Sequence, residues 1–443
     1  MVFRLVIIMV LLAPLPFALT LSWAWGSVAV LTGALLVAWS VELISSRDRP
    51  ALGLKTAWPL ILPYLCVAAW AAIQTLPALP EGWHHPLWQS TTAVLPVDVS
   101  GAISLNQNDT LDGIIRLLAY AGIFWLAFQY GRDLKQADLG LHALVAAGTV
   151  YSLYGLVVEF TQANLILWYP KPRHFDDLTS TFLNRNTFAT YAGFTLICIT
   201  ALILRGIARS LGSTASVRQG MRSLFQEFGR KGWGLLLCLS IVFSALLLSH
   251  SRAGFFSSLL GLAILFTALG FSKTIRPRTV AASLIGFIFV LVGFLALSGE
   301  GLNQRLVHAP IDLEGRTRIY ELELEAIKST PLLGTGYGTF EEVFRFYRNE
   351  DVQVNIDKAH NSYLEIVLEL GIPGAALLIL SVLIASVICL HGIRHRHRST
   401  LFPAIGIAVS AQVAVHSLVD FSLQIPAVAI TYSFLLGICC AQS

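Results

Sequence analysis

Charge is scarce in this sequence. Lys, Arg, Asp and Glu make up 13% of the 443 residues, whereas soluble domains average about 25%. Hydrophobic side chains make up 55%, which excludes an ordinary soluble domain, a disordered chain, a coiled coil and a disulfide-stapled scaffold. Because one membrane helix needs about 20 mostly apolar residues, the composition predicts an all-α, polytopic integral membrane protein with about 12 transmembrane helices.

Motifs that hold nucleotides or metal ions are missing as well. The sequence has no G-x-x-x-x-G-K-[ST], no H-E-x-x-H, no Cys-x-x-Cys and no Asp-x-Asp pair at an outer helix end. Its six cysteines lie inside apolar runs and are interpreted as small buried hydrophobes. The G-T-G-Y-G segment at 334–338 is interpreted as a turn, because it follows a helix and a proline. We therefore expect no metal ion and no cofactor, and the net charge of +4 is too small to indicate nucleic-acid binding.

Twelve apolar runs, bounded by charges or turn residues, account for most of the chain. They lie at about 5–21, 25–44, 57–76, 114–130, 139–158, 187–204, 233–250, 254–272, 279–298, 370–390, 401–419 and 425–441. The first run has features of a cleaved signal peptide, but Pro14 and Pro16 interrupt it and Trp23 and Trp25 crowd the cleavage site. We interpret it as a retained helix.

The basic residues predict the orientation of these helices. Connections rich in Lys and Arg follow every even-numbered helix, and such connections stay in the cytoplasm. Both termini are therefore expected in the cytoplasm. The opposite face would carry the segments 77–113, 159–186 and 299–369. The last of these is expected to be ordered, with an amphipathic helix from Arg316 to Ser329, a Gly-rich turn and a second helix that begins near Asn361.

Three arginines on the predicted outer face are candidates for binding an anion. Arg252 lies in a short turn between two apolar helices, where either an anionic ligand or lipid headgroups would stabilise its charge. Arg316 shares a helix face with Ile319 and is expected to point toward the surface on which that face packs. Arg318 lies off that face, near Glu321, which favours a solvated ion pair.

His360 is the candidate for proton transfer. It precedes a predicted helix start, where Ser362 and Glu365 have the spacing of a capping box and Asn361 is an alternative cap. A helix N-terminus favours a bound anion, and a neutral imidazole suits proton abstraction. The alternative is an ordinary surface histidine.

Two further polar segments adjoin predicted outer helix ends. Asn184, Arg185 and Asn186 directly precede a membrane helix, where they suit sugar or phosphate contacts but also helix capping. Asp420, at the outer end of the eleventh helix, is expected to partner one of the arginines.

The order of these segments along the chain resembles that of the O-antigen ligase and O-antigen polymerase superfamily of bacterial membrane glycosyltransferases. The matching segments are F-L-N-R-N-T-F-A, S-R-A-G-F, R-T-R-I-Y, P-L-L-G-T-G-Y-G-T-F, A-H-N-S-Y-L-E and H-S-L-V-D-F. The resemblance covers roughly residues 180–425. It suggests three parts: helices one to five in 1–180, a ligase-like core in 181–425 with the periplasmic loop 299–369, and the last helix in 426–443.

The resemblance implies a metal-independent enzyme of the bacterial inner membrane with a periplasmic active site. Such an enzyme moves a glycan from undecaprenyl pyrophosphate to a sugar hydroxyl, and lipid A-core is the leading acceptor. His360 would be the base or orient the acceptor. The residues that would bind the pyrophosphate and the rest of the donor are Arg252, Arg316, Arg318 and Arg185. Possible substrate contacts are Asn184, Asn186, Asn361, Tyr363 and Asp420.

The sequence leaves several alternatives open. A polymerase that joins lipid-linked repeat units shares the fold and the candidate residues, a protein O-oligosaccharyltransferase is a further alternative, and a transporter or flippase represents a different class. Segments 77–113 and 299–369 are expected to form the acceptor groove. A single displacement activated by one base predicts inversion at the anomeric carbon. The sugars of donor and acceptor and the oligomeric state are not predicted.

Overall fold

The computed structural model describes residues 1–46, 50–88, 90, 100–212, 229–271, 284–285, 288, 309–349, 356–396 and 400–443. Within these ranges the regular structure is helical, apart from one small antiparallel ribbon of β1 (Leu165–Ile166) and β2 (Tyr169–Pro170). The fold is therefore all-α, as predicted, and the ribbon is an addition that the sequence did not indicate.

Seven helices in the described ranges are long and apolar enough to cross a membrane. They are α2 (Ser22–Ser46), α3 (Leu54–Gln74), α5 (Gln107–Tyr130), α6 (Leu134–Phe160), α7 (Arg185–Gly212), α10 (Arg252–Phe271) and α15 (Ser362–His395). Shorter apolar helices are α1 (Val2–Leu12), α9 (Gly229–Leu248), α16 (Leu401–His416) and α17 (Pro426–Ala441). These helices coincide with eleven of the predicted runs, while the run at 279–298 lies outside the described residues except at 284, 285 and 288. The chain is a multi-pass membrane protein.

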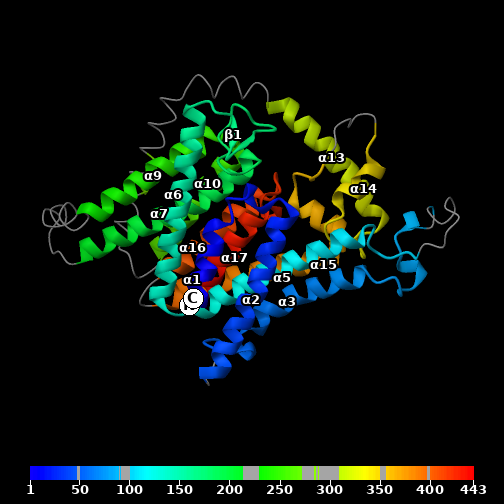
Figure 1. Cartoon of the computed structure of the whole chain (residues 1–443), viewed down its shortest axis with the longest axis horizontal. Coiled ribbons are helices and arrows are strands. Elements are labelled where there is room, and N and C mark those ends of the chain that lie inside the picture. Colours follow the sequence, from blue (N-terminus) through cyan, green and yellow to red (C-terminus); the bar gives the residue numbers. More distant parts are fainter. Residues whose placement is uncertain are drawn as a thin grey trace.

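Helices α7 and α17 form the interior of the bundle, and α2 lies at its edge (Figure 1). Small residues allow close approach, as at Gly437 of α17, where an added Cβ would lie 2.6 Å from the Phe124 carbonyl oxygen of α5. At the edge, Val30, Val37 and Ile44 of α2 are exposed. An apolar surface of this kind suits contact with lipid.

Both chain termini lie at one end of the bundle. The Phe3 ring stacks on Tyr130 with 5.3 Å between the ring centroids, and Arg132 donates to the Ala441 carbonyl oxygen at 3.3 Å. Arg205 pairs with Asp138 at this end as well. Arg132 and Arg205, which belong to two of the basic connections, thus lie at the same end as the termini, as the charge pattern requires. Which side of the membrane this end occupies stays a prediction.

A helical unit outside the apolar bundle lies between α10 and α15 in chain order (Figure 1). It contains α13 (Ala309–Ser329) and α14 (Phe340–Tyr347). Helix α13 ends at Ser329, before Pro331, as predicted, but it begins at Ala309 and not at the predicted Arg316, and α14 was not predicted. The described residues also form three short 3-10 turns: η1 (Phe17–Leu19), η2 (Glu81–Trp83) and η3 (Ser422–Gln424).

The G-T-G-Y-G segment is a turn, as predicted. Gly334, Gly336 and Gly338 have φ of 72°, 105° and 91°, which favours glycine. The backbone N–H groups of Thr335 and Gly336 donate to the Glu369 carbonyl oxygen. These N–H groups are therefore already hydrogen-bonded within the protein, and they connect the turn to α15.

The start of α15 settles the choice between two caps. Asn361 is the N-cap, since its Oδ1 accepts from the backbone N–H groups of Tyr363 and Leu364. Glu365 accepts instead from the Ala359 N–H at 3.0 Å. The capping-box interpretation of Ser362 and Glu365 is wrong, and Asn361, the alternative, is confirmed as the cap.

Candidate functional site

Polar residues gather at the end of the bundle opposite the termini. Helix α17 runs from this end, next to η3, to the end that holds Ala441. The backbone N–H of Ser362 at the start of α15 donates to the Ser417 carbonyl oxygen at 2.9 Å, and its hydroxyl donates to the Asp420 carbonyl oxygen at 2.8 Å. The turn between α16 and η3 is thereby fixed against the start of α15.

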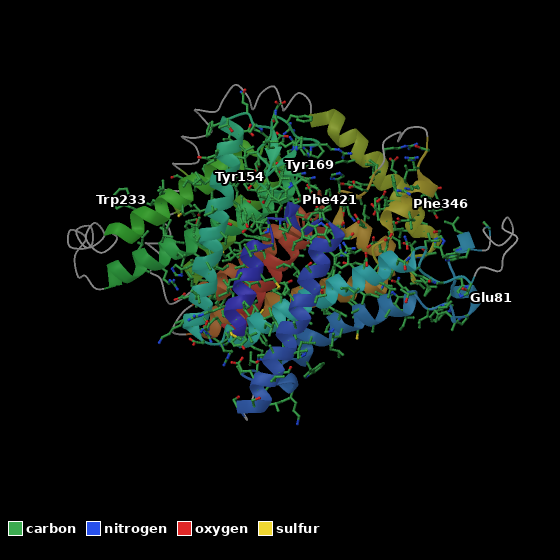
Figure 2. The ribbon with its side chains drawn as sticks, viewed as in Figure 1. Glu81, Tyr154, Tyr169, Trp233, Phe346 and Phe421 are labelled. Atoms are coloured by element: carbon green, nitrogen blue, oxygen red, sulfur yellow. The ribbon has the colours of Figure 1, made fainter. Side chains whose placement is uncertain are left out.

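His360 lies directly beside this turn. Its ring contacts Phe421, labelled in Figure 2, edge-on with 5.0 Å between the ring centroids. Its backbone is left-handed, with φ 57°, and its carbonyl oxygen accepts from the Tyr320 hydroxyl at 2.9 Å. Nδ1 is buried and has no hydrogen-bond partner among the described residues. Burial and the charge of Arg316 lower the pKa of His360 to about 4, so the imidazole is neutral at neutral pH and can accept a proton.

Asp420 is fully buried in the same turn. Its Oδ1 accepts from the Phe421 backbone N–H at 2.6 Å, while Oδ2 has no partner among the described residues. Burial raises the pKa of Asp420 to about 6, against opposing effects of the Phe421 N–H, Arg316 and Asn186. At neutral pH the residue is a buried carboxylate with one free oxygen.

Arg316 connects α13 to this turn, because its guanidinium donates to the Val419 carbonyl oxygen at 2.8 Å. Ile319 and Ile327 of the same helix are buried, as the predicted apolar face requires. Arg318 instead forms an exposed ion pair with Glu321 at 3.0 Å. This is the solvated pair that the residue pattern favoured.

Asn186 links the turn of Asp420 to the turn that carries Arg252. The Asn186 side-chain oxygen accepts from the Ser251 hydroxyl at 2.8 Å, and Arg252, the next residue, begins α10 with an exposed side chain. Asn184 caps α7, since its Oδ1 accepts from the Asn186 backbone N–H at 2.7 Å. Of the two interpretations of this segment, substrate contact and helix capping, capping is confirmed for Asn184.

Arg185, Asn361 and Tyr363 all have partners within the protein. Arg185 pairs with Asp177 at 2.8 Å, and the Tyr363 hydroxyl donates to the Ala414 carbonyl oxygen at 2.9 Å. The Asn361 oxygen is used in capping. The described contacts thus connect His360, Arg316, Asp420 and Asn186, with the Arg252 turn adjoining them.

Sequence reasoning missed two polar groups beside these residues. Asp177 accepts from His250 Nδ1 at 3.0 Å and from His174 Nδ1 at 3.3 Å. His416 Nδ1 lies 3.1 Å from the Thr190 hydroxyl, and its Nε2 has no partner among the described residues. No short motif marks Asp177. The H-S-L-V-D-F segment begins with His416, and this histidine beside Asp420 is the signal from which the group could have been predicted.

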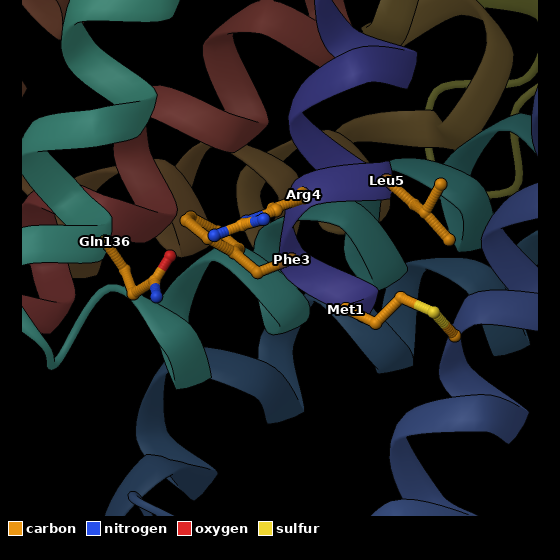
Figure 3. A pocket seen from close by; sticks show the side chains of 5 residues that line it. All are labelled: Met1, Phe3, Arg4, Leu5 and Gln136. Carbon is orange, nitrogen blue, oxygen red and sulfur yellow. The ribbon is translucent and has the colours of Figure 1, made fainter.

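Two further kinds of binding site, a metal site and a pocket, could lie elsewhere in the described residues. In the described ranges, no group of three His, Cys, Asp or Glu side chains is arranged to hold a metal ion. A pocket lined by Met1, Phe3, Arg4, Leu5 and Gln136 lies at the terminal end of the bundle (Figure 3). It is therefore separate from His360 and Asp420.

These features define a multi-pass membrane protein with a polar site where its apolar helices end. Residues 234–379 match the model of a protein family described as O-antigen ligase. That segment, about one third of the chain, is similar to the O-antigen ligase domain, so the resemblance expected from the sequence is confirmed there. The match includes Arg252, Arg316 and His360, whereas Asn186 and Asp420 lie outside it. A search of curated proteins found no match.

Proposed function

We propose that the protein transfers a glycan from undecaprenyl pyrophosphate to a sugar hydroxyl of lipid A-core, at the periplasmic face of the bacterial inner membrane. One observation carries the proposal: the neutral imidazole of His360, with an unbonded and buried Nδ1, is affected by the charge of Arg316 and contacts Phe421, the residue that follows Asp420. The similarity of residues 234–379 to O-antigen ligases supports a lipid-linked glycan as substrate.

The reaction needs a proton acceptor and a means of stabilising the leaving group. His360 takes the proton of the attacking hydroxyl, whose oxygen forms a bond to the anomeric carbon while the bond to the pyrophosphate oxygen breaks. Arg316 and Arg252 bind the pyrophosphate, where negative charge develops. Attack opposite the departing pyrophosphate inverts the anomeric carbon, which NMR of the product can verify.

Five other residues have supporting roles in this proposal. Asp420 and Asn186 adjoin His360 and the Arg252 turn, and we assign them to contacts with the sugar hydroxyls. Arg318, whose guanidinium lies in an exposed ion pair, is assigned to the rim of the donor site. Asn361 and Tyr363 have internal partners and serve mainly to hold the start of α15.

Segments 77–113 and 299–369 are proposed to form the acceptor groove. Their contact supports this assignment: the Leu105 N–H donates to the Thr335 carbonyl oxygen at 3.0 Å, and the Ser104 side chain lies against Gly336. An acceptor held between them would lie over the unit that carries Arg316.

Reconstitution tests the proposal. Purified full-length protein in liposomes is supplied with a lipid-linked glycan and lipid A-core, and the expected products are glycosylated lipid A-core and undecaprenyl pyrophosphate. If the donor glycan grows longer while lipid A-core stays unmodified, the protein is a polymerase. If the lipid-linked glycan crosses the bilayer without any transfer, the protein is a flippase and the proposed enzyme is refuted.

A further inference from the structure

Asp177 receives hydrogen bonds from three separate segments of the chain. The carboxylate accepts from Arg185 at the start of α7 at 2.8 Å, from His250 in the turn between α9 and α10 at 3.0 Å, and from His174 in its own loop at 3.3 Å. Lys171 donates to its carbonyl oxygen at 3.0 Å. One acidic residue thus joins the loop 161–184 to two helix ends of the candidate site.

Burial differs between the carboxylate and its partners. The Asp177 side chain is 10% exposed, whereas those of His174, Arg185 and His250 are 26%, 32% and 29% exposed. Burial raises the pKa of Asp177, but hydrogen bonds from His174 and His250 and the charge of Arg185 outweigh it and hold that pKa well below its usual range. Asp177 is therefore a mostly buried, ionised carboxylate, and its three hydrogen-bond donors are partly exposed to solvent.

Two of the residues that bind Asp177 have a strained backbone conformation. His250 has φ 52° and His174 has φ 60°, a left-handed conformation that is unfavourable for residues with a Cβ. Each of these histidines is bound to Asp177 through its ring. The Leu178 N–H adds a bond to the Leu248 carbonyl oxygen at 3.0 Å. The carboxylate thus stabilises a turn that glycine would adopt more readily.

The turn that Asp177 holds also positions two residues assigned to the donor. Ser251 follows His250 and donates to Asn186, and Arg252 follows Ser251. Arg185, bound directly by Asp177, precedes Asn186. A shift of His250 or of Arg185 would therefore move the chain that carries Arg252 or Asn186.

We propose that Asp177 is a positioning residue of the donor site, which fixes the Arg252 turn through His250 and the start of α7 through Arg185. The inference rests on the proposed transfer function. Its ligand class is the pyrophosphate of a polyprenyl-linked donor, and it assigns no contact with the acceptor. Loss of the carboxylate should therefore weaken donor binding and leave acceptor binding unchanged.

Asp177→Asn tests the proposal with Asp176→Asn as the matched control, because Asp176 is the neighbouring acid and is exposed. Full-length variants are compared for the KM of the lipid-linked donor, the KM of the acceptor, and binding of undecaprenyl pyrophosphate alone. We expect Asp177→Asn to raise the donor KM and weaken undecaprenyl pyrophosphate binding by about tenfold to a hundredfold, the effect of losing one hydrogen bond to a charged group. The acceptor KM of Asp177→Asn should stay within about twofold of wild type, because Asp177 is assigned no contact with the acceptor. All three constants of Asp176→Asn should also stay within about twofold of wild type, because Asp176 is an exposed residue outside the donor site.

Equal donor constants for Asp177→Asn and Asp176→Asn would overturn the proposal, and so would an equal rise in both KM values. If Asp177→Asn does not fold, His250→Phe decides, because it removes one donor and keeps the acid: a raised donor KM supports the proposal and a wild-type value refutes it. Wild-type protein without any transfer would refute the proposed function itself. Binding of undecaprenyl pyrophosphate tests Asp177 independently of transfer.

Discussion

Glu323 is a buried acidic residue, and replacing its ionisable group gives a quantitative test of the structure. The residue lies on α13, the helix that carries Arg316, and is fully buried. Neither carboxylate oxygen has a hydrogen-bond partner among the described residues. Burial, with the negative charges of Glu365 and Glu369, raises the pKa of Glu323 to about 9. The folded protein therefore holds this side chain in its protonated form at neutral pH.

The raised pKa makes stability depend on pH. In the unfolded chain Glu323 loses its proton above about pH 4.5, whereas in the folded chain it keeps the proton up to about pH 9. Its contribution to stability is fully present below pH 4.5 and is lost as pH rises toward 9. Three pH units above the unfolded pKa, at pH 7.5, the loss is about 4 kcal/mol, because each unit corresponds to about 1.4 kcal/mol.

Glu323→Gln keeps the shape of the protonated acid and cannot ionise. We expect the variant to be more stable than wild type at pH 7.5, by up to about 4 kcal/mol, and similar to wild type near pH 4.5. Unfolding of purified protein in detergent at several pH values measures this difference. Glu325→Gln is the control, because Glu325 lies on the same helix and is exposed. An unchanged pH dependence in Glu323→Gln, or a loss of stability at pH 7.5, would refute the reasoning.

Three further predictions concern the site and its supports. The transfer rate should fall in two steps on acidification, near pH 6 as Asp420 is protonated and near pH 4 as His360 is protonated; a single step near pH 6.5 in the pH–rate profile would contradict this. Asn361→Ala should destabilise the protein by about 1 kcal/mol through loss of the α15 cap, measured by unfolding, and Asn361→Asp should restore most of it. Gly334→Ala should lower the unfolding temperature, because its Cβ would lie 2.3 Å from the Glu369 carbonyl oxygen, whereas Gly26→Ala, with nothing within 4 Å, should change it little.

Long apolar helices could be predicted from the sequence, because a membrane helix must be apolar over a fixed length. The small elements could not be predicted from the sequence. Helix α14 has eight residues and is held by burial of Phe340, Val343 and Phe344 against α13 and α15. The ribbon of β1 and β2 has two residues in each strand. In both cases tertiary contacts, which no local pattern records, stabilise the element.

The candidate site was predictable where its residues carry a local signal. Arg252 and His360 stood out because a charge in a short turn and a histidine before a helix start are unusual positions. Asp177 carries no such signal, since its partner His250 is 73 residues away. The order of segments indicated a family, but the pairing of Asp177 with His250 depends on how α7, α9 and α10 pack.

The most direct test of the account is transfer by His360→Ala. Reconstituted protein is supplied with a lipid-linked glycan and lipid A-core, and His391→Ala is the control, because His391 is exposed toward the other end of α15. The account predicts that His360→Ala folds, binds undecaprenyl pyrophosphate and loses transfer by at least about a hundredfold, the contribution of a general base, while His391→Ala matches wild type. Transfer by His360→Ala at the wild-type rate would contradict it.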